Sequence, residues 1–150
     1  METELTLNEI YRASYALKNI IRPTNLIAAR AIRKGCEIYI KPENLQVTGS
    51  FKVRGAYYKI SQLSEEEKQR VKQGIKAGLE GLVGQVPGLI DVVVNVDGRL
   101  ASSNCDVMLD STLESPEALK AYATHPAHVA VADGKVRPYT VQRTCLDFEV

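Results

Sequence analysis

Apolar side chains recur at helical spacing near the start of the chain. Residues 7–21 place Ile10 and Leu17 on one face, as an amphipathic helix does. Thr6 and Glu9 precede and enter this stretch at the spacing of a capping box, in which each side chain accepts a hydrogen bond from the other residue's backbone. The pattern therefore predicts a first helix that begins just after Thr6.

The next 40 or so residues contain shorter apolar stretches separated by glycine and proline. Residues 26–33 are expected to form one or two helical turns that end at Gly35. Residues 37–41 read as a short strand stopped by Pro42, and residues 51–60 as a further helix. This part of the chain is thus predicted to be mainly helix and loop.

The second half of the chain alternates between helical and strand patterns. Residues 90–96 carry Ile90, Val92, Val94 and Val96 on one face of a predicted strand. The predicted elements after residue 64 are, in order, a helix to about Val86, strands over 90–96 and 106–113, helices from Pro116 to about Arg137, and a strand over 141–150. One strand is missing from a βαββαβ ferredoxin-like unit, so the fold class is expected to be α+β.

Composition restricts the class of protein. With 45% apolar and 25% charged residues among 150, the chain has the profile of a globular domain. It has no run of the roughly 20 apolar residues that span a bilayer, and its acidic start differs from a signal peptide. We therefore expect a cytoplasmic protein without membrane contact. Its three cysteines are too widely spaced for a disulfide or zinc pattern, and we expect buried, reduced thiols.

Charge divides the chain into two parts. Residues 1–70 contain 12 Lys and Arg against 8 Asp and Glu, whereas residues 71–150 contain 7 against 10. The overall net charge of +1 argues against binding to nucleic acid or to an anionic membrane surface. The shift in charge suggests that two differently derived segments meet near residue 70.

The first segment contains the run Ser50-Phe51-Lys52-Val53-Arg54-Gly55-Ala56. It resembles the amino-terminal region of threonine dehydratases, which have the tryptophan-synthase-β-like fold of enzymes that use pyridoxal phosphate (PLP). The resemblance extends over residues 5–70 and implies that Lys52 would carry PLP as a Schiff base with Phe51 beside the ring. The family's Ser-x-Gly-Asn-His loop and glycine-rich phosphate cup have no counterpart here. No cofactor is therefore expected, and PLP would bind Lys52 only if this resemblance were functional.

The second segment resembles the stress-responsive dimeric α/β-barrel family. The resemblance is carried by residues 79–89, 105–109 and 118–130. It implies a ferredoxin-like domain over 71–150 that forms a homodimer by packing two sheets into a barrel. The family's first strand is missing, and an open position inside a sheet leaves backbone groups unpaired. One hypothesis is that residues 37–41 supply this strand, and the alternative is a domain-swapped or partly disordered state.

The two histidines, His125 and His128, lie three residues apart around Pro126. Imidazole can accept or deliver a proton near neutral pH. The resemblance to plant polyketide cyclases of this family implies His128 and Tyr122 as catalytic residues, while His125 would contact a ligand. The alternative is that both histidines are structural. A metal site is not expected. The two histidines have no cysteine nearby and Asp133 as the one plausible carboxylate, which falls short of the three protein ligands that a catalytic zinc ion usually takes.

Other polar pairs are adequately explained by solvent exposure. Asp106 and Asp110 share one face of a predicted strand, and Tyr57 and Tyr58 lie among basic residues without a wider basic patch.

Together these patterns predict a small homodimeric stress-responsive α/β-barrel protein that binds a small apolar or aromatic molecule. Its threonine-dehydratase-like segment is catalytically incomplete. Three alternatives stay open: a cyclase-like enzyme that uses His128 and Tyr122, a PLP-dependent threonine dehydratase fragment, and a structural dimer without a ligand.

Overall fold

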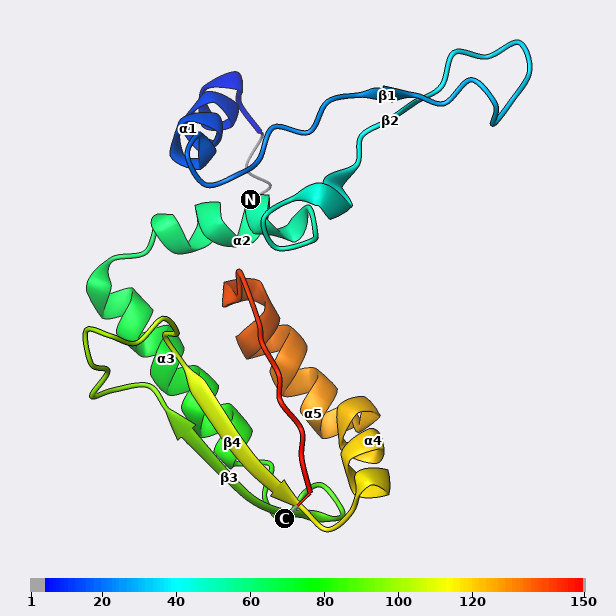
Figure 1. Cartoon of the computed structure of the whole chain (residues 1–150). Coiled ribbons are helices and arrows are strands. Elements are labelled where there is room, and N and C mark those ends of the chain that lie inside the picture. The colour runs from blue at the N-terminus through cyan, green and yellow to red at the C-terminus, as the bar shows by residue number, and fades with distance from the viewer. Residues whose placement is uncertain (1–4, 150) are drawn as a thin grey trace. The chain divides into compact units, whose positions relative to one another are not determined.

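The protein divides into two compact units in the computed structural model, which describes residues 5–149 (Figure 1). One unit contains residues 1–62 and 140–150, and the other contains residues 63–139. The change of family resemblance near residue 70 therefore lies inside the second unit. It falls within a helix that runs without interruption from Glu65 to Glu80.

The N-terminal unit has little regular structure between its two helices. Its elements are α1 (Leu7–Leu17), β1 (Ile27–Ala28), β2 (Tyr39–Ile40), the 3₁₀ turn η1 (Glu43–Leu45) and α2 (Lys52–Ser61). Thr6 and Glu9 form the expected capping box, which confirms the predicted start of α1. The helix ends earlier than predicted because the chain turns over residues 18–21, where two backbone N–H groups donate to the Leu17 carbonyl.

The helical turns expected over 26–33 are wrong. Ile27 and Ala28 are extended and pair antiparallel with Ile40 and Tyr39. Gly35 has a φ of 80°, a left-handed conformation that glycine adopts without steric cost. The chain can therefore reverse between the two short strands, and this pairing takes precedence over the local helical pattern.

The C-terminal unit is a two-stranded antiparallel sheet packed against helices (Figure 1). Its elements are α3 (Glu65–Glu80), β3 (Leu89–Asn95), β4 (Met108–Leu113), α4 (Pro116–Thr124), α5 (Pro126–Val131), the π-helical turn η2 (Ala132–Val136) and the 3₁₀ turn η3 (Arg137–Tyr139). Ser64 and Glu67 form a second capping box, and Ser115 caps α4 ahead of Pro116, both as predicted.

One continuous apolar core holds this unit together. Its buried members come from α3, the turn after it, β3 with the residue that follows it, and α4: Ile75, Leu79, Leu82, Val86, Leu89, Val92, Val94, Val96 and Tyr122. A side chain at Gly88 would place its Cβ 2.6 Å from that of Ala118, so glycine lets the start of β3 approach α4 closely.

Ile90 does not join the buried face of β3, contrary to the sequence pattern. The pairing of β3 with β4 shifts between Leu89 and Asp91, which is the sign of a bulge. An extra residue reverses the alternation on one side of the irregularity. Leu89 is therefore 7% exposed and Ile90 53% exposed.

The two strands expected to complete the C-terminal sheet are absent from it. Tyr39–Ile40 pairs with β1 instead, so residues 37–41 do not replace the missing first strand in this structure. The described residues 141–149 form no strand, and their alternating Leu146 and Phe148 are 83% and 75% exposed. Alternation gives a stable strand only where another strand pairs with it and a core covers one face.

All three cysteines, Cys36, Cys105 and Cys145, are exposed free thiols, so the expectation that they are buried is wrong. Each lies outside the helices and strands that form a core. None of the helices found in residues 5–149 has the length and apolar character needed to cross a bilayer.

Candidate functional site

Tyr122 and His128 form a ring pair in the C-terminal unit. Their ring centroids are 4.2 Å apart and the ring planes are inclined by 35°. Tyr122 is only 7% exposed and belongs to the apolar core, while His128 is half-buried. The Tyr122 hydroxyl and the His128 Nδ1 are both shielded from solvent. The structure thus brings together the two residues that the sequence predicted as a pair.

The break between α4 and α5 creates this geometry. The first helix ends at Thr124, and Pro126 begins the second, because a proline fits the first helical position but interrupts a helix interior. Without this break, residues six apart would lie on different faces of one helix. The change of direction lets His128 return to the ring of Tyr122.

His125 is part of the same break but has a structural task. It is the N-cap of α5, and its Nδ1 accepts a hydrogen bond from the Ala127 backbone N–H at 3.3 Å. This bond satisfies one of the backbone donors that every helix start leaves open. The geometry therefore gives His125 a capping role, and ligand contact by this residue stays a prediction.

The Tyr122–His128 pair has the groups needed to orient a polar atom or transfer a proton. A phenol is a donor and an acceptor, and imidazole changes protonation near neutral pH. Because the pair adjoins an apolar core, a ligand that reached it would find aromatic surface together with few polar atoms, which is typical of small-molecule sites.

Lys52 and Phe51, the residues implied for PLP binding, lie in the other unit at the start of α2. Both side chains are exposed, Phe51 to 63%. The Lys52 backbone N–H donates to the Ser50 hydroxyl, which helps to start the helix. A PLP enzyme shields the cofactor and holds its phosphate with converging backbone N–H groups. An exposed lysine beside an exposed phenylalanine provides neither, so these residues do not fit the cofactor.

A polar cluster of the N-terminal unit surrounds Glu43, which the sequence analysis missed. Arg54 donates to both carboxylate oxygens, at 2.8 and 2.9 Å, and the Thr24 hydroxyl donates to one of them at 2.8 Å. These hydrogen bonds, those from Arg54 first, lower the pKa of Glu43 to about 2. The cluster joins the loop before β1 to η1 and α2. Its signal in the sequence was limited to charged residues in a predicted loop.

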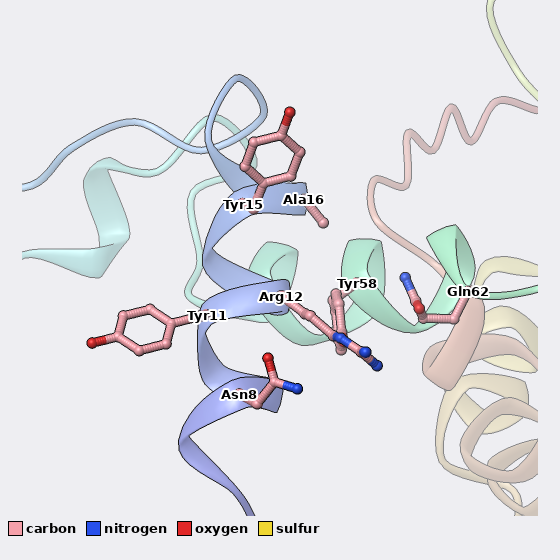
Figure 2. Close-up of a pocket in the computed structure, with 7 residues that line it drawn as sticks. All are labelled: Asn8, Tyr11, Arg12, Tyr15, Ala16, Tyr58 and Gln62. Atoms are coloured by element: carbon pink, nitrogen blue, oxygen red, sulfur yellow. The ribbon is translucent and has the colours of Figure 1, made fainter.

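An open groove lies between α1 and α2, also within the N-terminal unit (Figure 2). Its lining residues are Asn8, Tyr11, Arg12, Tyr15, Ala16, Tyr58 and Gln62. Tyr11 and Tyr15 project from α1 in Figure 2. Their spacing of four residues is the signal in the sequence that could have indicated an aromatic surface on this helix. Lys52 does not line the groove, so the groove supports no PLP site.

The remaining polar candidates are separate from both sites. Asp106 forms an ion pair with Arg99 at 2.6 Å, and Asp110 lies opposite Val93 in the sheet. In residues 5–149, no group of three His, Cys, Asp or Glu side chains is placed to hold a metal ion.

Two families of known proteins match the chain. The model of the "Stress responsive A/B Barrel Domain" matches residues 60–150, and that of the "Pyridoxal-phosphate dependent enzyme" matches residues 17–78. The prediction that the chain combines two family resemblances is therefore confirmed.

Enzymes that act on threonine resemble the N-terminal half of the chain. An "L-threonine ammonia-lyase" from Thermotoga maritima is 49% identical over 76 residues, which are 49% of this chain and 19% of the relative. An "L-threonine dehydratase catabolic TdcB" from Staphylococcus aureus strain N315 is 44% identical over 78 residues, 49% of this chain and 22% of the relative. The chain thus spans about a fifth of the length of these relatives.

Among solved structures, a "dimeric protein of unknown function and ferredoxin-like fold" from Bacteroides fragilis NCTC 9343 is 26% identical. It matches 48% of this chain and 69% of its own, with a TM-score of 0.44. The barrel-domain model covers more than half of the chain and confirms the predicted α+β fold class. The chain belongs to the stress responsive A/B barrel domain family.

Proposed function

We propose that the chain acts in the cytoplasm as a homodimer whose C-terminal unit binds a small apolar or aromatic molecule. The observation that carries this proposal is the contact between Tyr122 and His128, with ring centroids 4.2 Å apart beside the apolar core. The pair supplies aromatic surface and two polar atoms in a shielded place, and both features favour binding of a small ring compound.

The test uses the full chain and 1-naphthol as an aromatic probe. We expect the probe to shift the NMR signals of the Tyr122 and His128 rings. We expect His128→Ala to weaken binding about tenfold, which corresponds to about 1.4 kcal/mol. Tyr58→Phe is the control, since Tyr58 belongs to the other unit. Probe shifts confined to the α1–α2 groove would contradict the proposal.

Proton transfer by the same pair is the second candidate function. It is favoured by the position of the Tyr122 hydroxyl and the His128 Nδ1, both of which are shielded from water. Tyr122→Phe keeps the ring and removes the hydroxyl. If the pair is catalytic, this variant should bind 1-naphthol normally and lose turnover of a cyclisable polyketone substrate. Turnover that survives in Tyr122→Phe would limit the site to binding.

Dehydratase activity is not part of this proposal. The exposed Lys52 and Phe51 do not build a place for PLP, and the resemblance to the dehydratases covers about a fifth of their length. Treatment with PLP and borohydride should therefore label many lysines to a similar extent. Selective labelling of Lys52 would reopen the alternative.

A further inference from the structure

Residues 26–41 form a hairpin that the rest of the N-terminal unit leaves uncovered. Its arms are β1 and β2, which pair through two residues each, and the Ala29 N–H donates to the Ile38 carbonyl at 2.8 Å. Residues 30–37 between them contain no helix or strand, and in Figure 1 this loop extends away from α1 and α2. A two-stranded hairpin is only marginally stable by itself in water, so contact with another surface would stabilise it.

Large apolar side chains lie on both faces of the hairpin and in its loop. Residues directly opposite each other in an antiparallel pair point to the same side, so Ile27 and Ile40 share one face while Tyr39 lies on the other. These three side chains are 53%, 45% and 56% exposed, and Ile32 in the loop is 62% exposed. Contiguous apolar surface of this kind marks a place of contact with another protein or with lipid.

The same loop carries a local excess of positive charge. Arg30, Arg33 and Lys34 are exposed, and none of them forms an ion pair with a carboxylate of residues 5–149. Residues 26–36 contain no Asp or Glu, and Glu37 is the first acidic residue on the returning arm. The net charge of +1, from which we expected no binding to an anionic membrane surface, conceals this cluster of three cations.

The combination of apolar and basic residues selects the chemistry of the partner. A nucleic acid would pair with the cations but would not provide aliphatic surface for Ile32. An apolar protein surface would cover the isoleucines but would bury the cations without a partner, which costs free energy. A bilayer that contains anionic lipids has negative headgroups with hydrocarbon directly beneath them, and tyrosine is enriched at that boundary. Such a surface matches all three kinds of side chain in the hairpin.

We propose that the hairpin of residues 26–41 binds the surface of a membrane that contains anionic lipids. Ile32 enters the boundary between headgroups and acyl chains, and the neighbouring cations contact the lipid headgroups. The binding is peripheral and reversible, because one aliphatic side chain and three cations hold a protein far less firmly than a spanning helix. It is independent of the ligand site proposed in the other unit, so either proposal can fail without the other.

The exposed thiol of Cys36 provides a reporter in the loop of the hairpin. The full chain with Cys105→Ser and Cys145→Ser is labelled at Cys36 with nitrobenzoxadiazole, whose fluorescence rises and shifts to the blue when the label leaves water. We expect this change with vesicles of about 30% phosphatidylserine in phosphatidylcholine, and little change with phosphatidylcholine alone. Sodium chloride at about 1 M should reverse it, since the Debye length falls to roughly 3 Å.

Variants measured by cosedimentation with the anionic vesicles locate the contact. Arg33→Gln with Lys34→Gln removes two of the three cations and should weaken binding about 30-fold. Lys18→Gln with Lys52→Gln is the matched control, because it makes the same change of charge at two exposed lysines of the same unit outside the hairpin. This control should bind within about threefold of the parent chain. Ile32→Ser tests the apolar contact and should weaken binding about tenfold.

All of these positions are exposed, so circular dichroism of each variant should match that of the parent chain. A Cys36 label that stays in water with the anionic vesicles would overturn the proposal. Equal responses to anionic and neutral vesicles would also overturn it, since the cations would then have no role. Equal weakening by the two double variants would assign binding to total charge and not to the hairpin. A label that responds to duplex DNA but not to vesicles would assign the cations to a nucleic acid instead.

Discussion

The two units obtain order from different kinds of interaction. The C-terminal unit has strands of seven and six residues and a core of nine buried side chains that runs from α3 through β3 to α4. The N-terminal unit has two strands of two residues each, and both strands are exposed along their length. Its order comes from side chains that hydrogen-bond across loops.

Gln46 and Glu43 show how the N-terminal unit is held. Gln46 is 4% exposed and pairs with both backbone groups of Arg22, at 3.0 and 2.7 Å. Glu43 connects Thr24 and Arg54. Several large apolar side chains nearby remain exposed, among them Leu26, Ile27, Tyr39, Ile40 and Phe51. Among the described residues of this unit, Leu17 and Val53 are the buried apolar side chains, so polar contacts between loops supply much of its order.

The largest expected effect comes from Leu82→Ala in the core of the C-terminal unit. Leu82 is almost completely buried, and truncation of such a leucine costs about 3 kcal/mol through lost burial and the resulting cavity. Denaturant unfolding monitored by circular dichroism measures the loss. Val83→Ala is the control, because Val83 is exposed and adjacent. Equal losses in both variants would show that this core does not determine the stability of the unit.

Amide hydrogen exchange on the intact chain compares the two units directly. We expect strong protection of β3 and β4 and fast exchange at Tyr39 and Ile40, because protection follows burial and cooperative packing. Equal protection of the two regions would contradict the comparison. It would also revive the prediction that residues 37–41 complete the C-terminal sheet.

Loss of a helix cap has a smaller effect. Ser64→Ala removes the hydroxyl that accepts from the Glu67 N–H and should cost about 1 kcal/mol. We expect this cost in the unfolding of the C-terminal unit, since α3 packs on its core. Thr6→Ala removes the equivalent cap of α1 and should leave that transition unchanged. If both variants shifted the unfolding transition of the C-terminal unit equally, the two units would unfold together.

The smallest effect is the acid sensitivity of the Glu43 cluster, because its side chains remain accessible to solvent. The pKa of Glu43 is lowered from 4.5 to about 2, mainly by hydrogen bonds from Arg54. A lowered folded-state pKa contributes stability above the unfolded pKa of 4.5, and this stability is lost as the pH falls toward about 2. NMR titration of the Glu43 carboxyl measures the shift, and Arg54→Met should return the pKa toward 4.5. An unshifted pKa in the parent chain would contradict the cluster.

The sequence predicted the elements whose causes are local. Both capping boxes, the Ser115-Pro116 helix start and the alternation of Val92, Val94 and Val96 depend on residues a few positions apart. The pairing of Tyr122 with His128 was also predictable, because a family motif carried it. The two family resemblances, each present in a continuous stretch, were confirmed in the same way.

Tertiary structure alone decided which strands found partners. Residues 37–41 and 141–150 have strand patterns, yet the first pairs with Ile27–Ala28 and the described part of the second pairs with nothing in the sheets. The bulge that turns Ile90 outward and the arrival of Arg54 and Thr24 at Glu43 likewise join residues distant in sequence. The local pattern determines which secondary structure a segment can adopt. Strand pairing and ion pairing depend on which sheet edge and which charged side chain the rest of the chain places beside that segment.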